Sequence, residues 1–175
     1  MKIFATREYR LSQLPFGARL FYSLFLGMVF LGLLTCLGFA FGKSGISNDA
    51  LAEYYRPDGG GYGGKSFLEL LETAHFHLFS MPIFFLVLGH IFFLSSLAER
   101  TKLAVILAAF AALVAEIVLP WLIVYHSRAW VWLEHPTRIT LAATFLVFVL
   151  VPLREMWAGE SRPLEQTQED DASPT

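Results

Sequence analysis

Four apolar stretches, each close to the length needed to cross a bilayer, constrain the fold of this chain more than any other feature. A transmembrane helix needs about 20 mostly apolar residues, because each residue rises about 1.5 Å and the hydrocarbon core is about 30 Å thick. The stretches predict spans at about residues 20–41, 74–98, 103–126 and 139–157. We therefore expect an all-α fold, a four-helix transmembrane bundle that forms one membrane domain over residues 20–157.

The segments around these spans complete the predicted layout. Residues 1–19 form a short lead, residues 42–73 form the main loop outside the membrane, and residues 158–175 form an acidic tail predicted to be disordered. The chain is 55% hydrophobic and only 16% charged, which is too apolar for an ordinary soluble domain. The expected partner is thus the lipid bilayer, and the acidic tail indicates no nucleic-acid partner.

Basic residues predict how the bundle is oriented. Eight of the thirteen lysines and arginines lie on the side shared by both termini, and five, including Arg128 and Arg138 of a predicted outer loop, lie on the other side. Since cytoplasmic loops carry an excess of Lys and Arg, both termini are predicted to be cytoplasmic and the loop at 42–73 external. The single cysteine, Cys36, lies within the first span and forms no intramolecular disulfide.

A glycine-rich segment in the external loop matches the P-loop pattern G-x-x-x-x-G-K-S at residues 59–66. A working P-loop follows a buried strand, and no strand-like segment precedes this one, so we expect no nucleotide partner. Ser66 and Glu69 instead have the spacing of a capping box. They predict a helix that begins here and continues into the second span.

Histidines are concentrated in the second span, which contains His75, His77 and His90. Imidazoles are uncommon in transmembrane helices and usually face the interior of a bundle, so they mark a candidate site. His75 and His90 lie within about 60° of each other around a helix, whereas His75 and His77 differ by about 200°. The antiparallel third span should bring its last residue, His126, level with His75 or His77.

Two imidazoles at equal depth on adjacent helices are what bis-histidine haem ligation requires. We therefore predict haem b near the outer face, held by His126 with His75, or with His77 in its place. His90 is a further candidate whose axial partner the sequence does not identify. An alternative is a Zn or Cu ion at the outer face, with Glu72, His75, His77 and His126 as ligands.

Glu116 is the most notable acid in the spans. It continues a row of alanines at every fourth residue (Ala104, Ala108 and Ala112), so its carboxyl should face a neighbouring helix near the membrane centre. We expect it to hold a proton at neutral pH, because burial disfavours the ionised form. Its candidate role is a proton relay, and the alternative is a neutral, hydrogen-bonded acid.

The motif E-x-x-H-x-H-x-F-x-M-P at residues 72–82 is similar to that of uncharacterised bacterial four-span inner-membrane proteins, over about residues 50–126. That resemblance implies a bacterial inner membrane location and no particular activity. The histidine arrangement loosely resembles that of b-type cytochrome membrane subunits. This second resemblance implies electron transfer with a quinone or a c-type cytochrome, rather than a stand-alone enzyme. A non-catalytic subunit that docks with other membrane subunits is the alternative.

Overall fold

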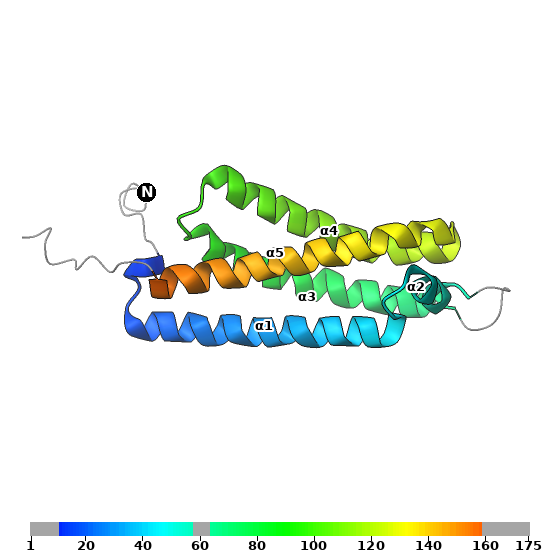
Figure 1. Cartoon of the computed structure of the whole chain (residues 1–175), viewed down its shortest axis with the longest axis horizontal. Coiled ribbons are helices and arrows are strands. Elements are labelled where there is room, and N and C mark those ends of the chain that lie inside the picture. The colour runs from blue at the N-terminus through cyan, green and yellow to red at the C-terminus, as the bar shows by residue number, and fades with distance from the viewer. Residues whose placement is uncertain (1–10, 58–63, 159–175) are drawn as a thin grey trace, which may run out of the picture.

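Four long helices form the computed structural model, which describes residues 11–57 and 64–158 (Figure 1). They are α1 (Phe16–Ser44), α3 (Phe67–Phe93), α4 (Glu99–Tyr125) and α5 (Val131–Ala158). A short helix, α2 (Asn48–Tyr55), and two 3-10 turns, η2 (Leu11–Gln13) and η3 (Arg128–Trp130), complete the fold. All four long helices are long and apolar enough to cross a membrane, and the described residues contain no strand. The predicted all-α, four-span bundle is confirmed.

The long helices run along a common direction, so the bundle has two distinct ends (Figure 1). At the terminal end, α1 begins and α5 ends. At the α2 end, α1 finishes at Ser44 and α2 lies across the neighbouring helices. The side of the membrane that each end faces stays a prediction.

The predicted lead and tail fall largely outside the described part of the chain. Residues 1–10 and 159–175 are not described, and neither are residues 58–63 of the glycine-rich loop. The described end of the lead differs from the prediction, because α1 already begins at Phe16.

The helix α3 begins at Phe67, seven residues before the predicted start of the second span at residue 74. Its start is the predicted capping box: Ser66 Oγ accepts a hydrogen bond from the Glu69 amide at 3.3 Å, and the Glu69 carboxylate accepts one from the Ser66 amide at 2.9 Å. These two bonds satisfy amide groups that have no partner inside the helix. The helix then continues without interruption into the second span, as predicted.

The last span also begins earlier than expected, and here the prediction was wrong. Residues 128–138 do not form an outer loop, because η3 leads directly into α5 at Val131. Ser127 Oγ accepts a hydrogen bond from the Ala129 amide at 3.2 Å, which starts this turn. Glu134 and Arg138 interrupt the apolar pattern of the sequence, yet both are helical and pair with each other.

Phenylalanines fill the centre of the bundle. Phe85 of α3 packs against Phe110 of α4 and Phe145 of α5, with ring centroids 5.1 and 5.3 Å apart. Phe92 packs edge-on against Phe148 at 5.2 Å. Such aromatic pairs are worth about 0.5–1.5 kcal/mol beyond the area they bury. The core therefore ties α3, α4 and α5 together.

By contrast, α1 is peripheral. In the described chain only Leu26 and Ser44 of this helix are buried, and it packs chiefly against α5. A Cβ added at Gly38 or Gly42 would meet no atom of the described residues within 4 Å. The G-x-x-x-G pair in α1 therefore does not bring two helices of this chain into close contact.

Polar side chains close the terminal end of the bundle. The Glu155 carboxylate of α5 accepts hydrogen bonds from the amide and the hydroxyl of Ser96, at 2.8 Å each for the nearest oxygens. Lys102 Nζ donates to the carbonyl of Phe93, the last residue of α3, and to that of Ser95 just after it. These bonds satisfy carbonyl and amide groups at the α3–α4 turn and hold that turn against α5.

Candidate functional site

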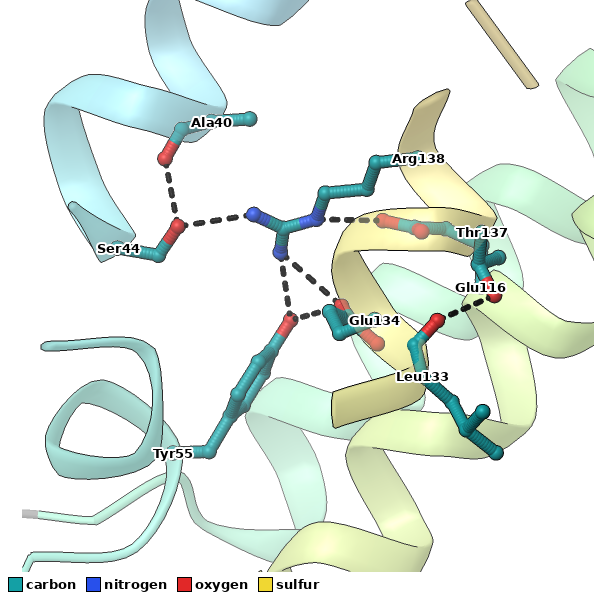
Figure 2. A network of polar contacts seen from close by, with 8 residues as sticks. All are labelled: Ala40, Ser44, Tyr55, Glu116, Leu133, Glu134, Thr137 and Arg138. Carbon is teal, nitrogen blue, oxygen red and sulfur yellow. Dashed lines mark hydrogen bonds and ion pairs between the residues drawn. The ribbon is translucent and has the colours of Figure 1, made fainter. Parts of the chain in front are cut away.

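Arg138 lies at the centre of a polar network near the α2 end of the bundle, shown in Figure 2. Its side chain, in the second turn of α5, is only 11% exposed. The guanidinium donates to Ser44 Oγ at 2.9 Å and to Glu134 Oε1 at 3.0 Å, and its Nε lies 3.5 Å from Glu116 Oε1. The partners belong to α1, α4 and α5, so one cation joins three transmembrane helices.

Glu134 is the most deeply buried member of the network, with a fully buried side chain. It precedes Arg138 by four residues, so the two side chains lie on the same face of α5. Its Oε1 also accepts a hydrogen bond from the Tyr55 hydroxyl at 3.1 Å. Because Tyr55 is the last residue of α2, this bond attaches α2 to the buried site (Figure 2).

Glu116 reaches the same guanidinium from α4 and is 18% exposed. As predicted, its carboxyl faces a neighbouring helix, α5, and Ala112, one turn earlier, is buried. Glu116 lies six residues, about 9 Å along α4, from Phe110, which packs against Phe85 in the core, and its predicted depth near the membrane centre stays a prediction. The alanine row gives the direction of a side chain around the helix and carries no information about depth.

Oxygen atoms with unused accepting capacity gather in this site. Glu116 Oε2 and Glu134 Oε2 are both buried and have no hydrogen-bond partner within the described chain. Pro120 lies inside α4, four residues after Glu116. Since proline has no amide hydrogen, the Glu116 carbonyl does not receive the usual helical hydrogen bond from that residue. Both carboxylates therefore keep an oxygen that no donor of the described chain reaches, and Arg138 Nε is likewise buried without a hydrogen bond there.

The charges of the site do not balance when every group is ionised. Two carboxylates, Glu116 and Glu134, face one guanidinium, Arg138, which gives a net charge of −1. An unpaired charge is costly in a low-dielectric environment unless a proton or another cation neutralises it. Chemically, the arrangement can hold one additional monovalent positive charge.

The short helix α2 covers the site from the aqueous side. Its buried residues Leu51, Ala52 and Tyr55 pack with Leu70, Ile123 and Val131 of the three neighbouring long helices. Burial, reinforced by the nearby Glu134 carboxylate, raises the pKa of Tyr55 above its ordinary value, so its hydroxyl remains a hydrogen-bond donor. The Tyr55 hydroxyl therefore joins α2 directly to Glu134 and Arg138.

The histidines of α3 lie apart from this network. His75 and His90 share one face of the continuous helix, as predicted, but that face is exposed and does not line the bundle interior. The His75 ring packs against Phe79 at 4.7 Å. His77 is half-buried, and its Nδ1 lies 2.8 Å from the Thr73 carbonyl oxygen of its own helix.

His126 directly follows α4 and accepts a hydrogen bond at Nδ1 from Trp130 Nε1 at 3.2 Å. Phe67 at the start of α3 packs against Trp121 of α4 at 5.1 Å, which aligns the two helices. From that level, His75 lies eight residues toward the terminal end and His126 five residues the other way, an axial offset of about 20 Å. The expectation of equal depth was wrong, because α3 starts level with Trp121 rather than with the end of α4.

Haem ligation by His75 and His126 consequently receives no support from this geometry and stays a prediction, as does any role of His77 or His90 as an axial ligand. A Soret band and a reducible α-band in protein made with ample haem would test it.

The predicted alternative of a Zn or Cu site is not assembled in the part of the chain that the structure describes. Nowhere in residues 11–57 and 64–158 do three or more His, Cys, Asp or Glu side chains gather so that they could hold a metal ion. The reason lies in the continuity of α3, which sends His75 and His77 to nearly opposite sides. Glu72 is exposed on the same helix.

The sequence interpretation missed Glu134, Arg138, Tyr55 and Ser44, although one signal pointed to Arg138. Glu116 and Arg138 lie eleven residues before and eleven residues after Ser127, where the chain turns between α4 and α5. In an antiparallel hairpin, residues equally distant from the turn lie at the same level. That symmetry identifies Arg138 as the partner of the buried acid, whereas counting charges alone assigns it to a loop.

Fold and site together define a class: a multi-pass integral membrane protein with a buried carboxylate–guanidinium site at one end of its bundle. Residues 45–163 match the model of a family, Aq_1264_TM, described as a transmembrane helical domain. The match covers more than half of the 175 residues, so the chain belongs to this family. It includes α2 to α5 and every residue of the network except Ser44. No curated protein and no solved structure shows significant similarity to the chain.

Proposed function

We propose that this protein is a proton-binding membrane component, in which Glu116 and Glu134 share one exchangeable proton beside Arg138. The observation that carries the proposal is the excess of one negative charge among Glu116, Glu134 and Arg138, whose side chains are 18%, 0% and 11% exposed. One proton on either acid leaves a neutral site in which the other carboxylate pairs with the guanidinium. The unpartnered Oε2 atoms of the two acids are the positions available to that proton.

Exchange of this proton with water takes place on the α2 side. The Tyr55 hydroxyl donates to Glu134 and receives a hydrogen bond from Arg138 Nη2 at 3.3 Å, so it lies between α2 and the buried acids. A hydroxyl both donates and accepts, and its hydrogen rotates to suit its partners. Tyr55 can therefore pass a proton to Glu134 while remaining neutral itself, because it gives up one proton and takes another.

Infrared difference spectroscopy of the full chain in lipid tests the proposal. We expect a carbonyl stretch from one protonated carboxyl at neutral pH. Glu116→Gln and Glu134→Gln should each abolish it, because either substitution leaves one acid and one guanidinium, a pair that is neutral without a bound proton. Glu72→Gln, which changes an exposed acid of α3, is the matched control and should keep the signal.

For the Arg138→Gln variant we expect the carboxyl signal to change in the opposite direction. Without the guanidinium, both acids need a proton, so the carboxyl signal should double. Removing one partner of a buried ion pair also costs roughly 3–5 kcal/mol of stability. A wild-type signal that is absent between pH 5 and 9, or that survives both Glu→Gln variants, contradicts the proposal. A signal that disappears when Na⁺ or K⁺ replaces a bulky organic cation would show that a metal cation, rather than a proton, is the occupant.

A further inference from the structure

One face of α3 is exposed along almost the whole helix and has a regular repeat. Its members alternate spacings of four and three residues: Glu72, Phe76, Phe79, Ile83, Leu86, His90 and Phe93, with His75 beside Phe76. We call this set the α3 stripe. Every member is exposed in the described chain, and the opposite face of α3 packs into the core through residues such as Leu70, Phe85 and Phe92.

His90 makes this face unsuited to lipid. Phe85 packs against Phe145, which lies at the middle of α5, so Phe85 marks the centre of the bundle. His90 follows five residues later, only about 7.5 Å further along the axis. Side chains in a helix lean toward its N-terminus, which for α3 is the α2 end. The imidazole therefore leans toward the bundle centre and not toward the nearer membrane surface.

The exposed face of α1 provides a comparison within the same molecule. Between Leu20 and Gly42 this helix has no charged residue and no histidine. Its exposed hydroxyl, on Thr35, donates to the Gly32 carbonyl of the same helix at 2.8 Å. Lipid can thus cover α1 without leaving a polar group unsatisfied, whereas lipid against His90 leaves both ring nitrogens without a partner.

We propose that a second copy of this chain covers the α3 stripe, with the two α3 helices side by side and parallel. Copies inserted in one membrane share one orientation, so a two-fold axis along the membrane normal is the symmetry that pairs identical faces. Alternating spacings of three and four residues form the seam of a left-handed helix pair, in which the apolar members interlock. The apolar members of the stripe are thus complementary to those of a second copy.

Hydrogen-bonding capacity at His90 also favours a second copy as the occupant. At the two-fold axis His90 meets the partner's His90. A neutral imidazole has one donor nitrogen and one acceptor nitrogen, so two such rings share one N–H···N hydrogen bond across the seam, which lipid cannot supply. A single polar position of this kind also specifies register in helix pairs. The dimer is independent of the proposed proton site, since no residue of the carboxylate–guanidinium network belongs to the stripe.

Disulfide cross-linking in the membranes of cells that express the full chain tests this dimer. In a Cys36→Ser background, cysteines are introduced singly at Ile83 and Leu86 of the stripe. The control is Leu78→Cys. Leu78 lies on the same helix and is 58% exposed, comparable with 63% at Ile83. Its side chain points about 140° away from that of Ile83 around the helix axis. Mild oxidation should yield a covalent dimer for Ile83→Cys and Leu86→Cys and little for Leu78→Cys.

His90→Leu supplies a second readout that does not depend on introduced cysteines. His90 is exposed in the single chain, so the substitution leaves the monomer fold intact. Loss of an interhelical hydrogen bond in a membrane should raise the dimer dissociation constant about three- to twentyfold, measured by energy transfer between labelled copies in lipid vesicles. Equal cross-linking at Leu78, adducts with a different protein at Ile83, or an unchanged dissociation constant in His90→Leu would overturn the proposal.

Discussion

Tyr55 connects the short helix α2 to the charged side chains of Glu134 and Arg138. Its ring lies in the contact between α2 and the long helices, while its hydroxyl bonds the Glu134 carboxylate at 3.1 Å. Burial raises its pKa above the ordinary value of 10.0, with Glu134 adding to the effect. The neutral phenol is thus the form that the folded state favours.

Tyr55→Phe should lower stability at neutral pH by about 1–2 kcal/mol, because a hydrogen bond to a charged group is lost. In the wild type, the contribution of the neutral phenol is complete below pH 10 and is lost as the pH rises through the higher folded-state pKa. Thermal unfolding in micelles between pH 8 and 11 should therefore show a steeper alkaline loss for the wild type than for Tyr55→Phe. Tyr125→Phe, at an exposed tyrosine, should behave like the wild type, and parallel curves for wild type and Tyr55→Phe would refute the assignment.

At the level of single residues, the sequence predicted directions around a helix better than depths and partners. The alanine row correctly turned Glu116 toward another helix, and the 15-residue spacing correctly placed His75 and His90 on one face. Whether that face is covered depends on how neighbouring helices pack, which no periodicity of α3 alone encodes. Arg138 was missed because a charge ordinarily ends an apolar stretch, while here its partners allow it to remain within one.

Among the described helices, α2 is the one that packs outside the main core of the bundle. It has only eight residues, begins at Ser47, whose Oγ accepts from the Ala50 amide at 3.1 Å, and docks through a small apolar cluster separate from the phenylalanine core. An isolated helix this short is not stable in water, so its structure depends on docking.

Leu51→Ala should therefore release α2 without unfolding the bundle. Leu51 is fully buried in the α2 cluster, and truncating such a side chain costs roughly 2–5 kcal/mol. Hydrogen exchange should accelerate strongly at residues 48–55 and remain unchanged in the core of α4. Ile46→Ala removes an aliphatic side chain that is 78% exposed and should have no such effect. Uniform acceleration through all helices would instead show that α2 is part of the global folding unit.

Element boundaries were predictable where a local hydrogen-bond motif marks them and not where tertiary pairing decides. The Ser66–Glu69 capping box located the start of α3 from four residues of sequence. The start of α5 depends on Glu134 and Arg138 finding Tyr55, Ser44 and Glu116, which come from three other helices. Such long-range partners cannot be read from a hydropathy pattern.

For the whole molecule, the buried Arg138 strengthens the predicted orientation. A guanidinium paired with two carboxylates inside the bundle no longer counts as a loop charge. The α2 end then has four remaining basic residues, Lys43, Arg56, Lys65 and Arg128, against eight at the side of the termini. Because orientation follows the excess of Lys and Arg, both termini should lie in the cytoplasm.

Reporter fusions test that orientation. A fluorescent protein joined after residue 175 should fold and fluoresce, and alkaline phosphatase inserted within residues 43–65 should be active, since it requires an oxidising compartment for its disulfides. Replacing Arg100 and Lys102 with glutamine should weaken the preference by removing part of the basic excess, although Lys102 also bonds two carbonyls. Phosphatase activity only at the C-terminal fusion would reverse the assignment.

The packing of α1 against α5 has a consequence for biosynthesis. The two helices touch, yet α5 is complete only at Ala158, more than a hundred residues after α1 ends at Ser44. At about 5–20 residues per second, a ribosome needs on the order of ten seconds to add that length. During this interval α1 must remain in the lipid without α5, its main packing partner. Its uncharged, apolar sequence is compatible with full exposure to lipid. The Arg138–Ser44 hydrogen bond can form only at the end of this interval, so it closes the assembly as a late step of translation.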